Sequence, residues 1–178
     1  IFSIFIQAGI EFEVQKEFNW LQNRWYDLYL PKYNAIIEIN GIQHYEPISL
    51  PDREQKSAEI IHKECVESDN IKQNAALQHN IAYYIIDARN QEEIFNNAKE
   101  ILTFIDFSNI SEFECGKFAT QNVVSKYCKL WNKGYSVEKI SNKLDCSIQT
   151  VQTRLRQGNI YNLCNYDKKL NMKNHRIT

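Results

Sequence analysis

Apolar and polar positions alternate along the first hundred residues in a way that marks short strands. Two apolar runs, Leu28–Leu30 and Ala35–Ile39, flank the turn-forming connector Pro31–Asn34, a pattern typical of a β-hairpin. Glu11–Phe18 alternates well enough to predict a strand before the hairpin, and Ile81–Ile86 predicts a buried strand after it. We therefore expect four strands.

Helical patterns surround these strands. Ile1–Ile6 is ambiguous between a strand and a buried helix, and the stop signal at Gly9 favours the helix. Pro47–Pro51 predicts a loop, and the mostly polar residues 52–79 predict one or two helices. After Gln91 the apolar residues recur at the spacing of a core-facing helix: Ile94, Ala98, Ile101, Leu102 and Ile105. The resulting order, α-β-β-β-α-β-α, indicates an α/β fold with a mixed sheet flanked by helices.

The second half of the chain shows helical periodicity alone. Its apolar positions predict one helix ended by Gly134 and two shorter segments separated by Asp145-Cys146-Ser147, with Ser147 as the N-cap of the last. The residues that carry these patterns are Val123, Tyr127, Leu130 and Trp131, then Val137, Ile140 and Leu144, then Ile148, Val151 and Leu155. Three helices with a tight turn before the last predict a small all-α helix-turn-helix module.

The hairpin brings two carboxylates together. If the four-residue connector is symmetric, Leu30 faces Ala35, and Asp27 lies across from Glu38 on the same side of the sheet. Like charges that face each other destabilise a sheet, and a buried carboxylate requires a neutralising partner. A bound hard cation such as Mg²⁺ or Mn²⁺ is the simplest candidate, since it takes one or two carboxylates from the protein and keeps several waters.

Charge divides the chain in two. Residues 1–115 hold 9 Lys and Arg against 19 Asp and Glu, a net charge of −10, whereas residues 116–178 hold 12 against 3, a net charge of +9. This split predicts a boundary near Cys115-Gly116 and gives the second half the sign of a nucleic-acid-binding module. Its basic, polar tail Lys168–Thr178 is expected to be disordered without a partner.

Composition limits where the protein works. The five cysteines are odd in number and form no C-x-x-C pair, which argues against a disulfide framework and a zinc site and favours a reducing compartment. No apolar run approaches the length of a membrane span. We expect a cytoplasmic protein in the compartment of the nucleoid or host-cell DNA. The sequence leaves the oligomeric state open, a homodimer included.

The stretch Glu38-Ile39-Asn40-Gly41-Ile42-Gln43-His44, preceded by Asp27 and followed by Asp69-Asn70-Ile71-Lys72, resembles a branch of the restriction-endonuclease-like PD-(D/E)xK superfamily. This branch includes the very-short-patch mismatch-repair endonuclease and phage-type homing endonucleases. The resemblance covers roughly residues 1–105 and implies a restriction-endonuclease-like fold. Asn40 departs from the pattern, because many relatives have a second acid there and the wider superfamily has lysine. Members of this branch also carry a glutamate on the first helix, which we expect to lie upstream of Ile1.

The resemblance implies a role for each matching residue. Asp27 corresponds to the metal-binding aspartate, Glu38 to the carboxylate of the second half-motif, and His44 to the catalytic histidine, which Asp69 orients. From the residues themselves we expect Mg²⁺ or Mn²⁺ on Asp27, with help from Glu38 or a backbone carbonyl near Ile39. We also expect His44 to be the base that takes a proton from water and Lys72 to face phosphate. Taken singly, these residues also fit structural roles, such as an i,i+3 pair between Asp69 and Lys72.

The segment Tyr135–Leu155 resembles the helix-turn-helix of bacterial transcription factors and recombinases, with Asp145 at a turn position where relatives commonly have glycine. The polar side chains left for DNA are Gln149, Thr150, Gln152, Thr153, Arg154 and Arg156. Gln and Arg can read adenine and guanine edges. A tri-helical protein-interaction module is the alternative for this half.

Together these observations predict a metal-dependent endonuclease that hydrolyses phosphodiester bonds of double-stranded DNA. Residues 1–115 are expected to form the endonuclease-like domain, and residues 116–178 a helix-turn-helix domain that guides it. The alternative is a non-catalytic DNA-binding protein with a decayed nuclease domain.

Overall fold

The structure, a computed structural model, describes residues 1–48 and 57–167. The chain divides into two compact units, Ile1–Ile110 and Ser111–Thr178. The division lies before Cys115 because α4 (Glu112–Asn132), which belongs to the second unit, begins directly after its N-cap Ser111. Within the described residues, no helix is both long and apolar enough to cross a membrane.

Parts of three sequence predictions fall outside the described ranges. These are most of the loop Pro47–Pro51, the start of the helical region 52–79, and the tail Lys168–Thr178.

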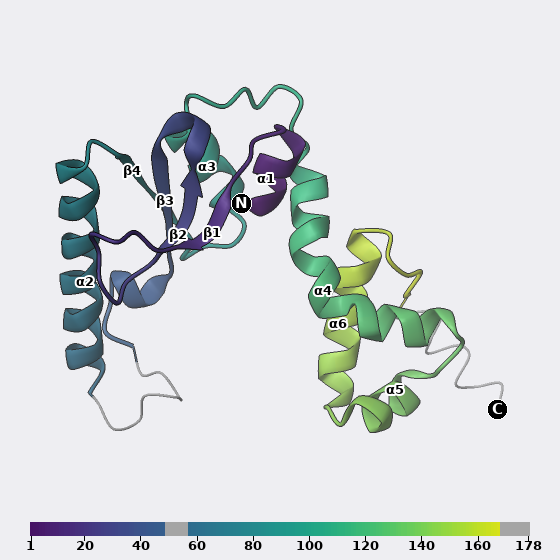
Figure 1. Ribbon diagram of the computed structural model, residues 1–178. Coiled ribbons are helices and arrows are strands. Elements are labelled where there is room, and N and C mark those ends of the chain that lie inside the picture. The colour runs from purple at the N-terminus through teal and green to yellow at the C-terminus, as the bar shows by residue number, and fades with distance from the viewer. Residues whose placement is uncertain (49–56, 168–178) are drawn as a thin grey trace. The chain divides into compact units, whose positions relative to one another are not determined.

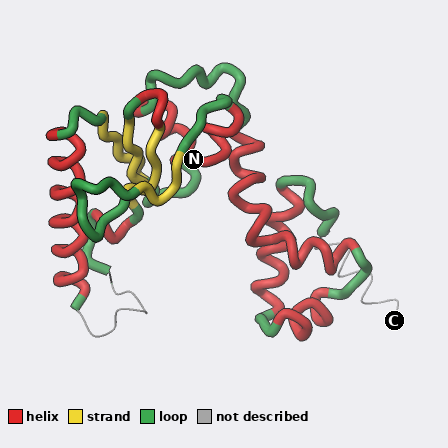
Figure 2. The backbone as a smooth tube through the Cα atoms, in the orientation of Figure 1, coloured by secondary structure: helices red, strands yellow, loops and turns green. Residues whose placement is uncertain are grey.

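A four-stranded mixed sheet forms the centre of the first unit (Figure 1). Its strands are β1 (Glu13–Lys16), β2 (Tyr26–Leu30), β3 (Ala35–Asn40) and β4 (Ala82–Asp87), in the spatial order β1-β2-β3-β4. β2 pairs antiparallel with β1 and with β3, while β4 lies parallel to β3. Figure 2 shows the strands of this sheet in yellow. The chain therefore crosses over between β3 and β4, as a parallel pair requires.

The β2–β3 hairpin has the predicted register. Leu30 pairs with Ala35, so the symmetric connector is confirmed. The connector is the 3₁₀ turn η1 (Pro31–Tyr33), and Asn34 closes it in the left-handed conformation at φ 44°. Pro fixes the first turn position and Asn tolerates positive φ, so these two residue types define the turn.

Helices cover both faces of the sheet. α2 (Ala58–Gln78) is a single helix whose Ala76 packs with Ile36 of β3 in one core cluster. On the opposite face Tyr84 of β4 contacts the ring of Phe104, which follows α3 (Ile94–Ile101). The remaining elements are α1 (Phe2–Gln7), which confirms the predicted opening helix, and the 3₁₀ turn η2 (Ile42–His44) after β3.

Two elements are shorter than predicted. β1 covers only part of Glu11–Phe18, and Gln15 within it has a left-handed φ of 52°. The helix predicted to reach Ile105 ends at Ile101, since Leu102 leaves helical geometry. The chain then turns so that Phe104 packs on Tyr33 and Tyr84, a long-range contact that helical periodicity does not reveal.

The second unit contains three packed helices: α4, α5 (Val137–Leu144) and α6 (Ile148–Ile160). Asp145 ends α5 at φ 48° and Ser147 caps α6, so α5 and α6 are joined by the predicted tight turn. Two of the apolar residues that predicted these helices lie outside the core, because Val123 and Ile148 are each 46% exposed. Val124 is buried in α4 instead, because the inward face of this helix is shifted by one residue.

Close helix packing in this unit depends on glycine. A Cβ on Gly158 of α6 would lie 2.2 Å from Cys128 Sγ of α4, and one on Gly116 would lie 2.4 Å from the Tyr161 hydroxyl.

Cys128 and Cys164, both buried, lie with their sulfurs 3.3 Å apart, and all five cysteines are free thiols. Burial raises the pKa of the Cys128 thiol to about 12, and the hydrogen bond with Cys164 adds to the rise.

Candidate active site

Two carboxylates connect β2 and β3 where the backbone pairing ends. The last paired residues are Leu28 and Ile37. Beyond them Asp27 Oδ2 accepts the N–H of Ile39 at 2.8 Å, and Glu38 Oε1 accepts the N–H of Asp27 at 3.2 Å. Asp27 and Glu38 thus lie side by side, and each gains one charge-assisted hydrogen bond from the backbone.

Glu38 is buried against α2, and Lys72 of that helix neutralises it. Glu38 is 2% exposed, and the Lys72 ammonium donates to its Oε2. Burial raises the pKa of Glu38 to about 7, the Lys72 ammonium opposes this rise, and the neighbouring Asp27 carboxylate adds to it. Burial is the larger effect because a carboxylate in a low-dielectric site loses its hydration.

The position of Lys72 corrects two expectations from the sequence. The protein supplies its own cation for Glu38, so a bound metal is not needed to neutralise this carboxylate. Lys72 also faces the sheet and is buried, whereas we expected it to face phosphate. The reason is tertiary, because the two partners lie 34 residues apart and meet only where α2 packs on the sheet.

His44 and Asp69 form the pair that the resemblance implies. Gly41 precedes the turn η2, which directs His44 toward α2, and His44 Nδ1 lies 2.6 Å from Asp69 Oδ2. A carboxylate only accepts, so Nδ1–H is the donor and Nε2 is left to bind a proton. Both side chains are about one-fifth exposed, so this imidazole is accessible to solvent.

Two tyrosines that the sequence analysis did not single out lie on the same side of the sheet as Glu38. The Tyr26 hydroxyl donates to the Lys72 carbonyl at 2.9 Å and so attaches α2 to the sheet beside Glu38. Burial raises the pKa of the Tyr83 phenol, and the carboxylates of Glu38, Asp69 and Asp27 raise it further. Pairing of Ile36 with Tyr83 puts this phenol on the Glu38 side of the sheet, a relation that requires the parallel register.

Asn40 provides a further oxygen on the same side of the sheet as Glu38, since the two are separated by one residue of β3. Asn40 is buried, and its Oδ1 has no hydrogen-bond partner in the described part of the chain. Among the described residues, no group of three or more His, Cys, Asp or Glu side chains is placed to hold a metal. The available oxygens are therefore two carboxylates and one amide, a set that suits a hydrated Mg²⁺ better than a fully protein-ligated ion.

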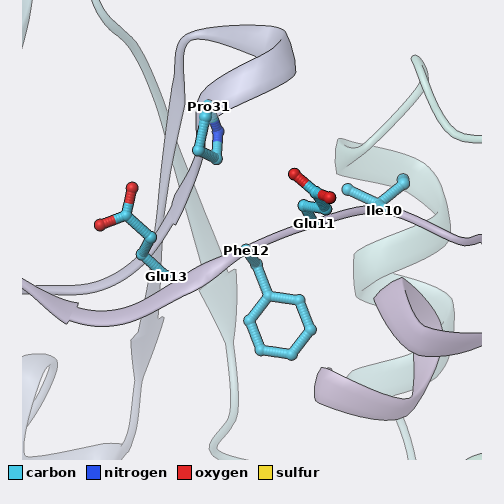
Figure 3. Close-up of a pocket in the computed structure, with 5 residues that line it drawn as sticks. All are labelled: Ile10, Glu11, Phe12, Glu13 and Pro31. Atoms are coloured by element: carbon cyan, nitrogen blue, oxygen red, sulfur yellow. The ribbon is translucent and has the colours of Figure 1, made fainter.

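Two of the cavities formed by the described residues open on the first unit. One, of about 480 Å³, is lined by Ile10, Glu11, Phe12, Glu13 and Pro31 and shares no residue with the carboxylate site. Figure 3 shows Glu11 and Glu13 on one side of their segment and Phe12 on the other. The second cavity, of about 240 Å³, includes Lys72 in its lining and so adjoins the site.

The six residues predicted to contact DNA all lie on α6, outside the core of the second unit. Gln149, Thr153 and Arg156 are exposed and share one face at helical spacing. Thr150 and Arg154 have local partners, since the Thr150 hydroxyl lies 2.9 Å from Ser147 Oγ and Arg154 donates to Gln157 at 3.0 Å. Gln152 is half-buried beside the exposed set.

Comparisons with protein-family models, with curated proteins and with solved structures find no match to this chain. The residues of the site therefore supply the grounds for a function. Two adjacent carboxylates can bind a hard cation, an imidazole held by a carboxylate can accept a proton, and a buried ammonium can stabilise negative charge.

Proposed function

We propose that this chain is a divalent-metal-dependent DNA endonuclease with a restriction-endonuclease-like first unit and a helix-turn-helix in the second. One observation carries the proposal, namely the convergence of Asp27, Glu38, Lys72 and the His44–Asp69 pair between one sheet face and α2. These residues come from three separate stretches of sequence. A buried carboxylate with a raised pKa beside an oriented histidine is typical of hydrolytic sites.

Asp27 and Glu38 are the residues that would hold Mg²⁺ or Mn²⁺, with the unpartnered Asn40 Oδ1 as a further oxygen on the same side of β3. Among the carboxylate oxygens, Asp27 Oδ1 is the most available, because its hydrogen bond from Gln15 Nε2 is long, at 3.4 Å. When bound, the ion supplies Lewis-acid polarisation of a phosphoryl oxygen and a more acidic water.

The chain's own residues handle the proton and the charge. His44 accepts the proton of the attacking water at Nε2, while Asp69 holds Nδ1–H and stabilises the imidazolium that forms. Lys72 keeps Glu38 in place through its ammonium, and Tyr26 fixes Lys72 by binding its backbone carbonyl. These contacts orient the site before substrate arrives, which lowers the reorganisation needed for reaction.

The second unit is proposed to bring DNA to the site. Residues 111–178 contain 12 Lys and Arg against 5 Asp and Glu, so this unit carries a net charge of +7. The exposed face of α6 presents Gln149, Thr153 and Arg156 to solvent. Positive charge supplies affinity for phosphate, and an exposed helix after a tight turn suits the major groove.

One observation favours a second candidate, a non-catalytic DNA-binding protein that retains a decayed nuclease unit. Lys72 occupies one oxygen of Glu38, which leaves that carboxylate less free for a metal. This candidate predicts normal DNA binding with no cleavage in Mg²⁺ or Mn²⁺.

Cleavage of plasmid DNA by the full-length protein tests the proposal. We expect Mg²⁺-dependent nicking or double-strand cleavage that falls by orders of magnitude in Asp27→Asn and in His44→Ala, since each loses a metal ligand or the base. Asp106→Asn is the matched control, because Asp106 is an exposed aspartate of the same unit whose contact is with Ser108. Gel-shift affinity should stay the same in all variants. Equal single-turnover rates for Asp27→Asn and Asp106→Asn would exclude the site.

A further inference from the structure

The second cavity of the first unit is lined by side chains that donate hydrogen bonds. Its lining consists of Gln15, Asn23, Arg24, Trp25, Ser68 and Lys72. Two of the six are cationic, three carry an amide or hydroxyl, and one is an indole. None is a carboxylate. A concave surface with this lining matches an anion that also carries an aromatic ring.

The cavity opposes the charge of its own unit. Residues 1–110 contain 9 Lys and Arg against 17 Asp and Glu, a net charge of −8, whereas the cavity lining has no carboxylate. Of its two cations, Lys72 is paired with Glu38, so Arg24 supplies the positive charge of the cavity. Arg24 forms no ion pair with any residue that the structure describes. Its Nε donates to Ser68 Oγ at 3.4 Å, a long bond that leaves the terminal guanidinium nitrogens for a ligand.

Trp25 makes one wall of the cavity and is 52% exposed. The exposed indole is therefore available to stack on a flat ligand. Asn23, two residues earlier, has a left-handed φ of 57°, and Gln15 has one of 52°. Gln seldom adopts positive φ, so the lining includes a strained residue at Gln15.

The cavity is continuous with the candidate active site through two of its residues. Gln15 Nε2 donates to Asp27 Oδ1 at 3.4 Å, and the Lys72 ammonium donates to Glu38. A ligand in the cavity therefore lies next to both carboxylates. The neighbour of a scissile phosphate in a DNA strand is another nucleotide, which has an anionic phosphate and a flat base.

We infer that this cavity binds a nucleotide of the DNA strand adjacent to the phosphate that is cut, with its phosphate on Arg24 and its base stacked on Trp25. The inference rests on the proposed nuclease function and assigns the residues that hold the substrate strand in the first unit. Arg binds phosphate through two parallel N–H donors, and tryptophan stacks on any base without sequence preference. This contact positions the strand, while sequence is read elsewhere.

Titration of the full-length protein with thymidine 3′,5′-bisphosphate, without divalent metal, tests the inference. We expect the ligand to quench tryptophan emission and Trp25→Phe to remove most of that quenching, because the other two tryptophans lie outside the cavity lining. Arg24→Ala should weaken binding about tenfold. Lys32→Ala is the matched control, since Lys32 is an exposed cation at the opposite end of β2 from Asp27.

Several results would overturn the inference. Equal affinity of Arg24→Ala and Lys32→Ala for the bisphosphate excludes a phosphate contact with Arg24. Undiminished quenching in Trp25→Phe excludes base stacking there, as does equal binding of inorganic phosphate and the bisphosphate. If Arg24→Ala fails to fold, Arg24→Lys, which keeps the charge and loses the paired donors, gives the same comparison.

The experiments can exclude the nuclease function and the nucleotide site independently of each other. Loss of cleavage in Asp27→Asn together with unchanged bisphosphate binding in Arg24→Ala retains the nuclease and excludes the nucleotide site. Arg24-dependent binding in a protein that cuts no DNA retains the nucleotide site and excludes the nuclease.

Discussion

Replacement of Lys72 by methionine tests whether the buried ion pair with Glu38 holds α2 on the sheet. Methionine keeps most of the apolar stem but removes the ammonium that donates to Glu38 Oε2. Glu38, at 2% exposure, would then be left in an apolar site without a cation. Removal of one partner of a buried ion pair typically costs about 3–5 kcal/mol. We expect a loss of this size at pH 8.

The loss should depend on pH in a defined direction. In the wild-type protein burial raises the Glu38 pKa from 4.5 to about 7, so between these values the native state binds more protons than the unfolded state. The free energy of unfolding therefore falls as pH rises through this window, by up to about 3 kcal/mol. The Lys72 ammonium lowers the pKa of Glu38, so its removal should raise this pKa further. A protonated carboxyl needs no cation, so Lys72→Met should be much less harmful at pH 5 than at pH 8.

Urea unfolding followed by tryptophan fluorescence measures the effect. A Trp131→Phe background confines the signal to Trp20 and Trp25, both in the first unit. Lys99→Met, at an exposed lysine of α3, is the control and should change stability by no more than about 0.5 kcal/mol. Adding Glu38→Gln to Lys72→Met should recover most of the loss at pH 8. If Lys72→Met and Lys99→Met unfold alike at both pH values, the buried ion pair does not stabilise the unit.

Three further predictions concern the metal, the proposed DNA-binding helix and the packing of the second unit. Millimolar Mg²⁺ or Mn²⁺ should raise the melting temperature of the wild-type protein by native-state binding, with a gain of about 1–3 kcal/mol that Asp27→Asn abolishes at constant ionic strength. Arg156→Ala should weaken DNA binding by roughly 1–3 kcal/mol in gel shifts and leave single-turnover cleavage at saturation unchanged. Gly158→Ala should destabilise the second unit by about 1–3 kcal/mol, because the new Cβ would overlap Cys128 Sγ, and a double-mutant cycle with Cys128→Ala should show coupling.

Local chemistry made several elements predictable. Pro31 and Asn34 define a four-residue turn, and the turn fixes the pairing of Leu30 with Ala35. In the second unit Ser147 caps α6 and Asp145 adopts the left-handed conformation at the turn, both through interactions within a few residues. Such signals act over short distances along the chain, so they can be read without tertiary information.

Other features were predicted wrongly or were missed, because each depended on a residue distant in the sequence. The end of α3 is set by the packing of Phe104 on Tyr33 and Tyr84, against the helical periodicity that extends to Ile105. In α4 Val124 is buried in place of Val123, because Val124 is the residue that packs into the core cluster with α5 and α6. Apolar spacing shows that one face of a helix points inward. It does not show which of two adjacent apolar residues lies nearer the centre of that face.

The candidate site shows the same division. Strand alternation and a symmetric turn were enough to make Asp27 and Glu38 neighbours, since together they leave no other register. Three features could be recognised only in the folded chain. These are the cation that neutralises Glu38, the carboxylates that raise the pKa of Tyr83, and the cavity that Arg24 and Trp25 line. The amino-acid order specifies each charge, but packing selects its partner, because an ammonium 34 residues away reaches Glu38 only after α2 buries its apolar side chains against the sheet.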